Sequence, residues 1–251
     1  MVQLRLKKPN ALVFDITGTV AKTSFIDKVL LPYILNNFKS YILENWNSRS
    51  VRMNLEMLSE ESQKDPQSPM FRLKGIKEDD VHHAFLYLNY LHQNSIENKA
   101  LILLRFHMWF DGYQKNRLET PVYSDVAIQI QKWRCDQEIK LYVLSNGWAE
   151  ASKRFLTKTN HGDLNLLIDG YFDSSLGPLN EPATFETLLN RIQEKPENVI
   201  LLTKSSEQGQ AAQQLGLTVV LVLTHRRNIE KLDEKGRQMP RVRSFNELEF
   251  E

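Results

Sequence analysis

The ten residues from Ala11 to Val20, A-L-V-F-D-I-T-G-T-V, constrain the fold more than any other part of this chain. The apolar run at their start predicts a buried strand of a parallel sheet, which delivers Asp15 to its carboxyl end. Gly18 then allows the chain to turn sharply. Ligands of open α/β sheets bind just outside the carboxyl ends of the strands. The sequence therefore predicts that Asp15 lies where ligands bind and chemistry takes place.

Apolar runs that lack strict alternation predict the strands of a single parallel sheet: Ala11–Asp15, Ile139–Ser145, Asn198–Thr203 and Leu217–Leu223. Amphipathic segments between the later runs predict helices at Ser124–Gln137, Trp148–Thr157, Thr184–Gln193 and Ser205–Leu215. Pro196 and Gly216 are suitable stops after two of these helices. Strands that alternate with helices are typical of an α/β fold with a doubly wound parallel sheet.

The segment from about residue 23 to residue 118 has helical spacing and little strand signal. Apolar side chains recur every three or four residues at Ile26, Val29, Leu30, Tyr33, Ile34 and Phe38, and again at Val81, Phe85, Leu88 and Leu91. The polar stretch Glu60–Pro69 predicts an exposed loop. We therefore expect a core domain of residues 1–22 and 119–251, and an all-helical cap of residues 23–118. The tail Arg241–Glu251 is expected to dock a last short element.

Composition limits the classes of partner and compartment. The formal net charge of the 251 residues is +1, which gives no general reason to expect nucleic acid or an anionic membrane as partner. Cys135 is the only cysteine, so no internal disulfide is expected. Met1–Lys8 is too short and charged for a secretory signal, and no apolar run approaches the ~20 residues of a membrane span. We expect a cytoplasmic, possibly also nuclear, monomer or weak oligomer.

Several motifs connect the chain to a known family. D-I-T-G-T at Asp15–Thr19 resembles the first motif of the haloacid dehalogenase-like phosphatases, D-x-[DE]-G-T. Further stretches resemble the enolase-phosphatases, also called acireductone synthases: F-I-D-K-V-L-L-P-Y (Phe25–Tyr33), H-M-W (His107–Trp109), K-W-R (Lys132–Arg134), L-Y-V-L-S-N-G (Leu141–Gly147) and D-G-Y-F-D (Asp169–Asp173). The resemblance implies a haloacid dehalogenase-like core with a helical cap inserted after the first strand. It also implies Mg²⁺-dependent enolisation and dephosphorylation of a diketo-methylthiopentyl phosphate in methionine salvage.

The resemblance assigns a role to each residue of the first motif. Asp15 holds the position of the nucleophile that forms an aspartyl-phosphate, and the alternative is an aspartate that caps the next helix. Thr17 stands where the family has a second carboxylate, which protonates the leaving oxygen. A threonine hydroxyl does not titrate near neutral pH, so Thr17 cannot perform this step. Its backbone carbonyl could still face a metal. In some phosphoryl-transferring relatives a threonine here slows the breakdown of the aspartyl-phosphate, so this change alone implies a slow or altered enzyme.

The second motif is retained and the third is not. Ser145 matches the residue that hydrogen-bonds the phosphoryl group, and the backbone amides of Asn146 and Gly147 could help to cradle its oxygens. The third motif is a lysine that offsets negative charge. In the loop G-P-L-N of residues 177–180, Leu179 occupies its place, and no lysine occurs between Lys158 and Lys195. Loss of this cation should raise the barrier to phosphoryl transfer by several kcal/mol.

The fourth motif supplies acidic metal ligands in the family. Here Lys204 replaces the metal-binding aspartate and Gln208 replaces the second acid, while Glu207 is one position out of register. Mg²⁺ prefers carboxylate oxygens, and an ammonium repels it. We therefore expect no metal or other cofactor; if one is bound, Asp15 and Thr17 are its candidate ligands. Our hypothesis is that the Lys204 ammonium replaces both the Mg²⁺ and the missing lysine in a salt bridge with Asp15. The alternative is that Lys204 points to solvent.

Weaker signals complete the candidates. Metal binding by His82, His83 and His92 is less favoured than solvation or packing, and His107 and Trp109 are interpreted as packing residues rather than cleft residues. A basic crevice of Lys204, His225, Arg226 and Arg227 could hold an anion, and a surface formed by Phe106, Trp109, Phe110 and Tyr113 could bind a protein.

Three interpretations of function remain. The favoured one is a catalytically inactive enolase-phosphatase-like protein, a pseudophosphatase, that binds an unknown protein or a small anionic ligand. The alternative is a working Mg²⁺-dependent enolase-phosphatase with altered or weak activity. The third is a sensor that retains the cleft and binds an anion or metabolite.

Overall fold

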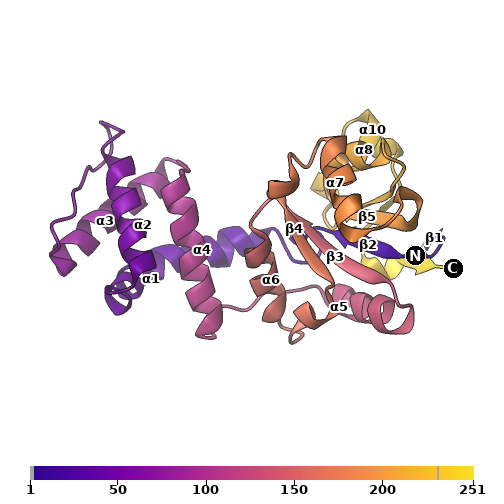
Figure 1. The fold of residues 1–251 in the computed structure, drawn as a ribbon, viewed down its shortest axis with the longest axis horizontal. Helices are drawn as coiled ribbons and strands as arrows, with labels where there is room; N and C mark the ends of the chain where they lie inside the picture. Colours follow the sequence, from indigo (N-terminus) through magenta and orange to yellow (C-terminus); the bar gives the residue numbers. More distant parts are fainter. Residues whose placement is uncertain (1–2, 231) are drawn as a thin grey trace. The chain divides into compact units, whose positions relative to one another are not determined.

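A computed structural model of the chain describes residues 3–230 and 232–251, with the side chains of residues 226 and 227 outside the description. The chain forms two compact units (Figure 1). The core unit comprises Met1–Thr23 and Glu119–Glu251, and the helical unit comprises Ser24–Leu118. Each unit is described by itself below.

The core unit is built on a six-stranded sheet with the order β4-β3-β2-β5-β6-β7. Every neighbouring pair in it is parallel. The strands are β2 (Ala11–Phe14), β3 (Lys140–Ser145), β4 (Gly170–Asp173), β5 (Val199–Thr203), β6 (Thr218–Val222) and β7 (Arg241–Val242). All four side chains of β2 are 0% exposed, as a strand covered on both faces requires. The predicted α/β fold with a parallel sheet is confirmed.

The strand β4 at one edge of the large sheet was not predicted. β4 has the sequence G-Y-F-D and none of its residues is fully buried, so it lacks the apolar run that marks β2. The tail does dock, as predicted: β8 (Leu248–Phe250) pairs in parallel with β1 (Leu4–Leu6) in a separate two-stranded sheet. Phe245, which precedes β8 in the chain, is 0% exposed, and its ring centroid lies 5.2 Å from that of Trp133.

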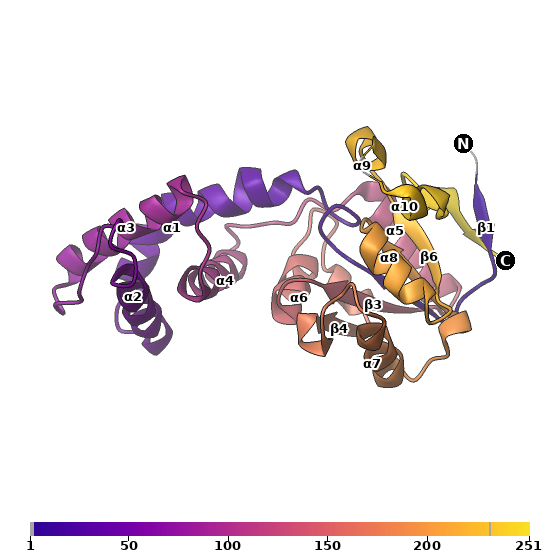
Figure 2. The same ribbon diagram turned by 90° about the horizontal axis from the view of Figure 1, so that it is seen from above.

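Helices cover both faces of the large sheet (Figure 2). On one face α5 (Ser124–Gln131), the π-helix η2 (Lys132–Asp136) and α6 (Ala149–Thr157) contribute to one apolar cluster. On the other, α7 (Pro182–Ile192) and α8 (Ser206–Gln213) contribute to a second. The remaining short elements are the 3₁₀ helices η3 (Leu164–Leu167), η4 (Ser174–Leu176), η5 (Pro196–Asn198) and η6 (Phe245–Glu247), with α9 (Arg226–Glu230) and α10 (Glu234–Gln238).

The helix boundaries differ from prediction in detail. The segment predicted as one helix from residue 124 to 137 changes to π geometry at Lys132. α7 ends at a left-handed Gln193 (φ +56°), before Pro196 is reached. Gly216, with φ +89°, follows α8 as the stop that the sequence predicted.

The helical unit consists of the π-helix η1 (Ile26–Leu30), α1 (Leu31–Glu44), α2 (Arg49–Ser62), α3 (Lys77–Gln93) and α4 (Lys99–Gln114). Most of the side chains with predicted helical spacing are buried, and Val29 is an exception at 41% exposure. The predicted loop Glu60–Pro69 is helical as far as Ser62. The reason is that the Ser59 hydroxyl donates to the Phe71 carbonyl and the Ser62 hydroxyl accepts from the Phe71 amide, which fixes the end of α2.

The chain leaves the core unit and returns to it at paired backbone, which we call the neck. Ala21 forms an antiparallel bridge with Val122, and the Tyr123 amide donates to the Val20 carbonyl at 3.1 Å. The neck therefore closes the long excursion of the helical unit within the core unit itself.

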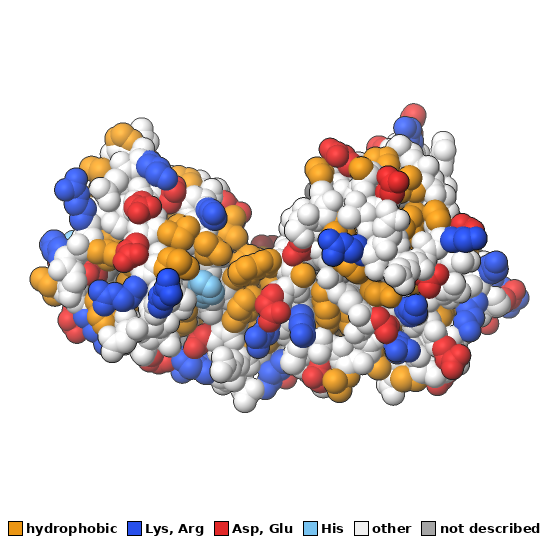
Figure 3. Space-filling model, viewed as in Figure 1, with side chains coloured by type: hydrophobic (Ala, Val, Ile, Leu, Met, Phe, Trp, Pro, Cys, Tyr) orange, Lys and Arg blue, Asp and Glu red, His pale blue; other side chains and the backbone are white. Residues whose placement is uncertain are grey.

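Charged side chains of both signs are interspersed over the face shown in Figure 3, in keeping with a net charge of +1. Within residues 3–230 and 232–251, no helix is both long enough and apolar enough to cross a bilayer.

Candidate functional site

Asp15 follows the central strand β2, and the strand order places two other candidates beside it. β2 lies between β3 and β5, with Phe14 opposite Val143 on one side and Leu202 on the other. β3 ends at Ser145 and β5 ends at Thr203, directly before Lys204. The carboxyl ends of these strands therefore bring the predicted nucleophile, the predicted phosphate-binding serine and Lys204 to one edge of the sheet.

The Asp15 carboxylate is poorly satisfied by hydrogen bonds. Its Oδ2 accepts from the Thr203 hydroxyl at 3.3 Å, whereas its Oδ1 is buried with no partner among the described residues. Burial raises the pKa of the Asp15 carboxyl above its usual range. The nearby Thr19 hydroxyl and Lys204 ammonium act in the opposite direction on this pKa. Folding thus favours the protonated form of Asp15 relative to an aspartate in water.

Lys204 points into the site rather than to solvent. Its Nζ donates to the Thr17 carbonyl at 2.5 Å. Its stem crosses the Gly18 backbone, since a Cβ on Gly18 would lie 2.8 Å from Lys204 Cδ. The predicted salt bridge is wrong in its geometry, because none of the ion pairs in the described part of the chain joins Lys204 to Asp15. The ammonium is held instead by the Thr17 carbonyl, and from there it still lowers the pKa of Asp15.

The donor set at this edge does not fit Mg²⁺. Octahedral Mg²⁺ needs several oxygen ligands with negative charge. Asp15 offers a carboxylate, but the Thr17 carbonyl is already bound by an ammonium that would repel the ion. Glu207 is exposed, so the acid that is one position out of register is not drawn in. Among the described residues no group of three His, Cys, Asp or Glu side chains could hold a metal ion.

Gln208, at the position of the family's second acid, does reach the site. The Thr203 hydroxyl lies 3.0 Å from Gln208 Oε1 and 3.3 Å from Asp15 Oδ2, and it accepts from the Ser205 amide at 3.1 Å. A hydroxyl has one proton, so Thr203 can donate to only one of its two acceptors at a time. Neither Thr203 nor Thr19 was predicted as a site residue. The available signal was a hydroxyl side chain at a buried strand end.

The loop after β3 holds its serine by its own backbone. The Gly147 amide donates to the Ser145 hydroxyl at 3.0 Å, so it is not free to cradle a phosphate as predicted. Asn146 is exposed. The neighbouring Asp173, opposite Ser145 in the register, accepts from the Ala149 amide at 2.8 Å and the Ser175 amide at 2.9 Å. Its carboxylate is therefore occupied in holding the starts of two helices.

Leu179, in the place of the family's lysine, is only 5% exposed. It belongs to the apolar cluster on the face covered by α7 and α8, together with Phe185 and Leu188. The side chain at this position therefore contributes packing, and it brings no positive charge to the sheet edge.

The candidates in the helical unit are packing residues. Trp109 is 8% exposed and its Nε1 donates to the Leu30 carbonyl at 2.9 Å. His107 Nδ1 lies 2.8 Å from the side-chain nitrogen of Asn54, and burial lowers the pKa of this histidine. Tyr113 is also buried, so the exposed aromatic face predicted for α4 is not formed by its full set of residues.

The remaining histidines do not gather into a metal site. His83 Nδ1 lies 2.8 Å from the Asp79 carbonyl, which is local helix bonding, and His92 is exposed. Of the predicted basic crevice, Lys204 is bound to Thr17 and His225 lines a cavity that does not have Lys204 in its lining. The side chains of Arg226 and Arg227 lie outside the described part of the chain.

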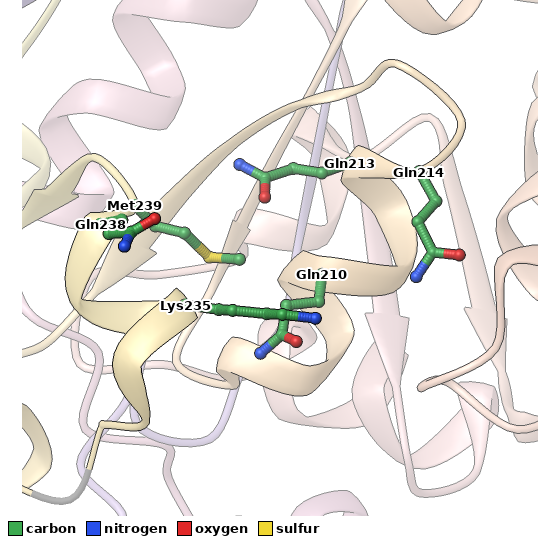
Figure 4. Close-up of a pocket in the computed structure, with 6 residues that line it drawn as sticks. All are labelled: Gln210, Gln213, Gln214, Lys235, Gln238 and Met239. Carbon is green, nitrogen blue, oxygen red and sulfur yellow. The ribbon is translucent and has the colours of Figure 1, made fainter.

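Another hollow of the core unit is remote from Asp15 in sequence. It has a volume of about 460 Å³ and lies between α8 and α10 (Figure 4). Glutamine side chains dominate its lining, which consists of Gln210, Gln213, Gln214, Lys235, Gln238 and Met239. It contains none of the candidate site residues.

A parallel sheet with an aspartate after its central strand, followed by a helical insertion, defines the haloacid dehalogenase-like proteins. Solved structures agree with this class. The UTR4 protein of Saccharomyces cerevisiae superposes with a TM-score of 0.74 at 21% identity, covering 95% of this chain and 99% of that one. The haloacid dehalogenase-type hydrolase YfnB of Bacillus subtilis superposes with a TM-score of 0.55 at 14% identity, covering 96% and 97%.

Sequence relatives narrow the class to a family. Enolase-phosphatase E1 of Xenopus tropicalis is 31% identical over 245 residues, which cover 95% of this chain and 94% of the relative. The protein of the same name from Aquifex aeolicus is 24% identical, covering 96% and 99%. No protein-family model matches the chain. The chain belongs to the enolase-phosphatase E1 family.

Proposed function

We propose that this chain is a non-hydrolysing member of its family, a pseudophosphatase that works by binding a protein or a small anionic ligand. The observation that carries the proposal is the Lys204 ammonium on the Thr17 carbonyl, beside the Asp15 carboxylate. A cation of the chain itself thus stands where the resemblance places a metal ligand.

Electrostatics supports the absence of turnover. Phosphoryl transfer depends on positioning and on stabilisation of negative charge. Thr17 has no group that titrates near neutral pH, and Leu179 is part of an apolar layer. The Lys204 ammonium adds one positive charge, but its hydrogen bond to a backbone carbonyl fixes it away from direct contact with Asp15. Each missing contribution is expected to cost about 3 kcal/mol of barrier, or roughly a hundredfold in rate.

The alternative function, a Mg²⁺-dependent phosphatase of methionine salvage with weak activity, is favoured by one observation. Asp15 and Ser145 remain at the ends of adjacent strands, where a phosphoryl group could meet both. The two proposals differ in turnover, which can be measured directly.

The first experiment is a phosphatase assay. The purified chain is incubated with p-nitrophenyl phosphate and Mg²⁺, with Asp15→Asn as the control variant. We expect equal background rates from the two proteins. Mg²⁺-dependent turnover that Asp15→Asn abolishes would refute the pseudophosphatase proposal and favour the alternative.

The second experiment tests the ammonium itself. Lys204→Asp restores an acidic ligand beside Asp15, so Mg²⁺ should then stabilise the protein, by about 1.4 kcal/mol at tenfold excess over its dissociation constant. Lys195→Asp makes the same charge change at an exposed position and should show no Mg²⁺ effect. The chain without substitution should show none either, and Mg²⁺ stabilisation of that chain would contradict the proposal.

A further inference from the structure

A second cavity of the core unit does not have Asp15 in its lining and carries a different chemistry. It has a volume of about 190 Å³ and lies among the loop after β2, the start of α5, the end of β6 and the segment between β7 and β8. Polar and basic side chains dominate its lining, with Val222 and Phe245 as its apolar wall. We propose that this cavity is a binding site for a small oxyanion of the phosphate class.

One hydroxyl group in the lining is buried without a partner. The Tyr123 hydroxyl has no hydrogen-bond partner within the described residues, whereas the Thr19 hydroxyl, in a residue only 1% exposed, faces Asp15 and lowers the pKa of its carboxyl. A buried polar group without a partner destabilises the folded chain. An occupant with several acceptor oxygens would offset that cost, since the Tyr123 hydroxyl can donate.

The charges around the cavity favour an anion. Lys22, His225 and Arg243 line it, and none of them takes part in an ion pair of the described chain. One acid, Asp125, also lines it. Its Oδ2 already accepts from the Ser244 hydroxyl at 2.6 Å and from the Phe245 amide at 2.9 Å. This carboxylate is therefore bound to the start of the η6 segment.

Glu247 is the other acid at this place, and it too is engaged. Its Oε2 accepts from the backbone amide of Arg243 at 3.0 Å, which leaves the guanidinium without a described carboxylate partner. α5 begins next to the cavity at Ser124, and its N-cap residue Tyr123 provides no side-chain cap. The positive end of the helix dipole therefore adds to the basic side chains.

The size of the cavity limits the ligand. Sites for drug-sized molecules measure about 300–1,000 Å³, so about 190 Å³ suits a single tetrahedral oxyanion better than a nucleotide. The shared chemistry is a phosphate group, either as the free ion or at the end of a slim ligand.

The test is a titration of the full chain with inorganic phosphate, followed by amide NMR shifts and calorimetry, with sodium chloride at matched ionic strength as reference. We expect saturable shifts around residues 19–22, 123–125 and 243–245. Arg243→Gln should weaken binding about tenfold, the effect of one charge-assisted hydrogen bond. Arg241→Gln, two residues earlier on β7, is the matched control, because its guanidinium donates to the Arg237 carbonyl and does not line the cavity.

Two further variants separate this site from Asp15 and from a folding defect. Tyr123→Phe removes a hydroxyl without a described partner, so it should leave stability intact and weaken phosphate binding by a factor of about three to ten. Ser145→Ala should leave binding unchanged. Three outcomes would overturn the proposal. The first is no saturable binding up to 20 mM phosphate, a concentration about a hundredfold above the dissociation constant of a useful site. The others are binding that is insensitive to both Arg243→Gln and Tyr123→Phe, and binding that is lost in Ser145→Ala. Phenyl phosphate distinguishes the free ion from a phosphate group at the end of a ligand. If phenyl phosphate binds more weakly than inorganic phosphate, the ligand is the free ion. If it binds equally or more tightly, the ligand is a terminal phosphate group.

Discussion

Replacement of Lys204 by methionine tests whether this ammonium is a structural cation of the site. The variant keeps an unbranched stem over Gly18 and removes the charged donor to the Thr17 carbonyl. A charged hydrogen bond contributes about 1.5–3 kcal/mol, and the partial exposure of Lys204 places this one near the lower end. Removal also deprives the buried Asp15 carboxylate of its nearest positive charge. We therefore expect Lys204→Met to lower the free energy of unfolding by about 2 kcal/mol at pH 7.

The pH dependence of this loss follows from Asp15. Burial raises the folded pKa of Asp15 above its ordinary value of 3.8, so the folded chain binds more protons than the unfolded chain at pH values between the two pKa values. Stability is then lost as pH rises through that window. Without Lys204 the folded pKa rises further and the window widens upward. The loss caused by Lys204→Met should therefore be larger at pH 7 than at pH 3.5, where Asp15 is largely protonated in both states.

Calorimetry and urea unfolding, followed through the buried Trp133 of the core unit, measure the effect. A loss of 2 kcal/mol corresponds to a fall of about 4–8 °C in Tm for a chain of this size. In an Asp15→Asn background the same substitution should cost about 0.5 kcal/mol less, because only the hydrogen bond to Thr17, worth about 1.5 kcal/mol, is then removed. An equal loss with and without the Asp15 carboxylate, or an unchanged Tm at pH 7, would refute the reasoning.

Three further predictions concern single substitutions. Asp15→Asn should raise the free energy of unfolding at pH 7 by about 1 kcal/mol, because it removes a buried charge with an unpartnered oxygen, and this gain should vanish below pH 3.8 in a pH series of urea curves. Gly18→Ala should lower the free energy of unfolding by about 2 kcal/mol or more, since φ is +89° and the new Cβ would lie 2.8 Å from a side-chain carbon. The control Gly75→Ala, with φ +77° and open space, should lower it by only about 1 kcal/mol, with both losses measured by calorimetry. Trp109→Phe should lower the stability of the helical unit by about 1–2 kcal/mol through the lost hydrogen bond to the Leu30 carbonyl, and an unchanged helical circular dichroism melting curve would contradict this.

The sheet was predictable where its strands are apolar on both faces. β2, β3, β5 and β6 have runs of Val, Leu and Ile that no amphipathic helix would show. β4 was missed because G-Y-F-D is half polar and half exposed at the edge of the sheet. β7 was missed because two residues carry no periodicity. The pairing of β1 with β8 joins segments from opposite ends of the chain, which local patterns cannot reveal.

The candidate site was predictable to the level of strand ends and no further. The order of apolar runs placed Asp15, Ser145 and Lys204 at one edge, since parallel strands present their carboxyl ends together. The partner of the Lys204 ammonium depends on the path of a flexible side chain over Gly18, so residue type alone could not distinguish Asp15 from the Thr17 carbonyl. The exposure of the aromatic residues on α4 was overestimated because α1 and α2 pack against that helix.

The neck has a consequence for the folding and the modularity of the chain. Closure of a flexible loop of about a hundred residues costs about 4 kcal/mol of chain entropy, and the core unit must meet that cost before β2 and β3 can pair. A helical unit that has already folded shortens the effective loop to the distance between its own ends. Because Ala21 and Val122 are paired in an antiparallel bridge, the helical unit is an insertion that a few glycine residues could replace without a change in sheet register. A helical unit that folds first therefore lowers the entropic cost of pairing β2 with β3.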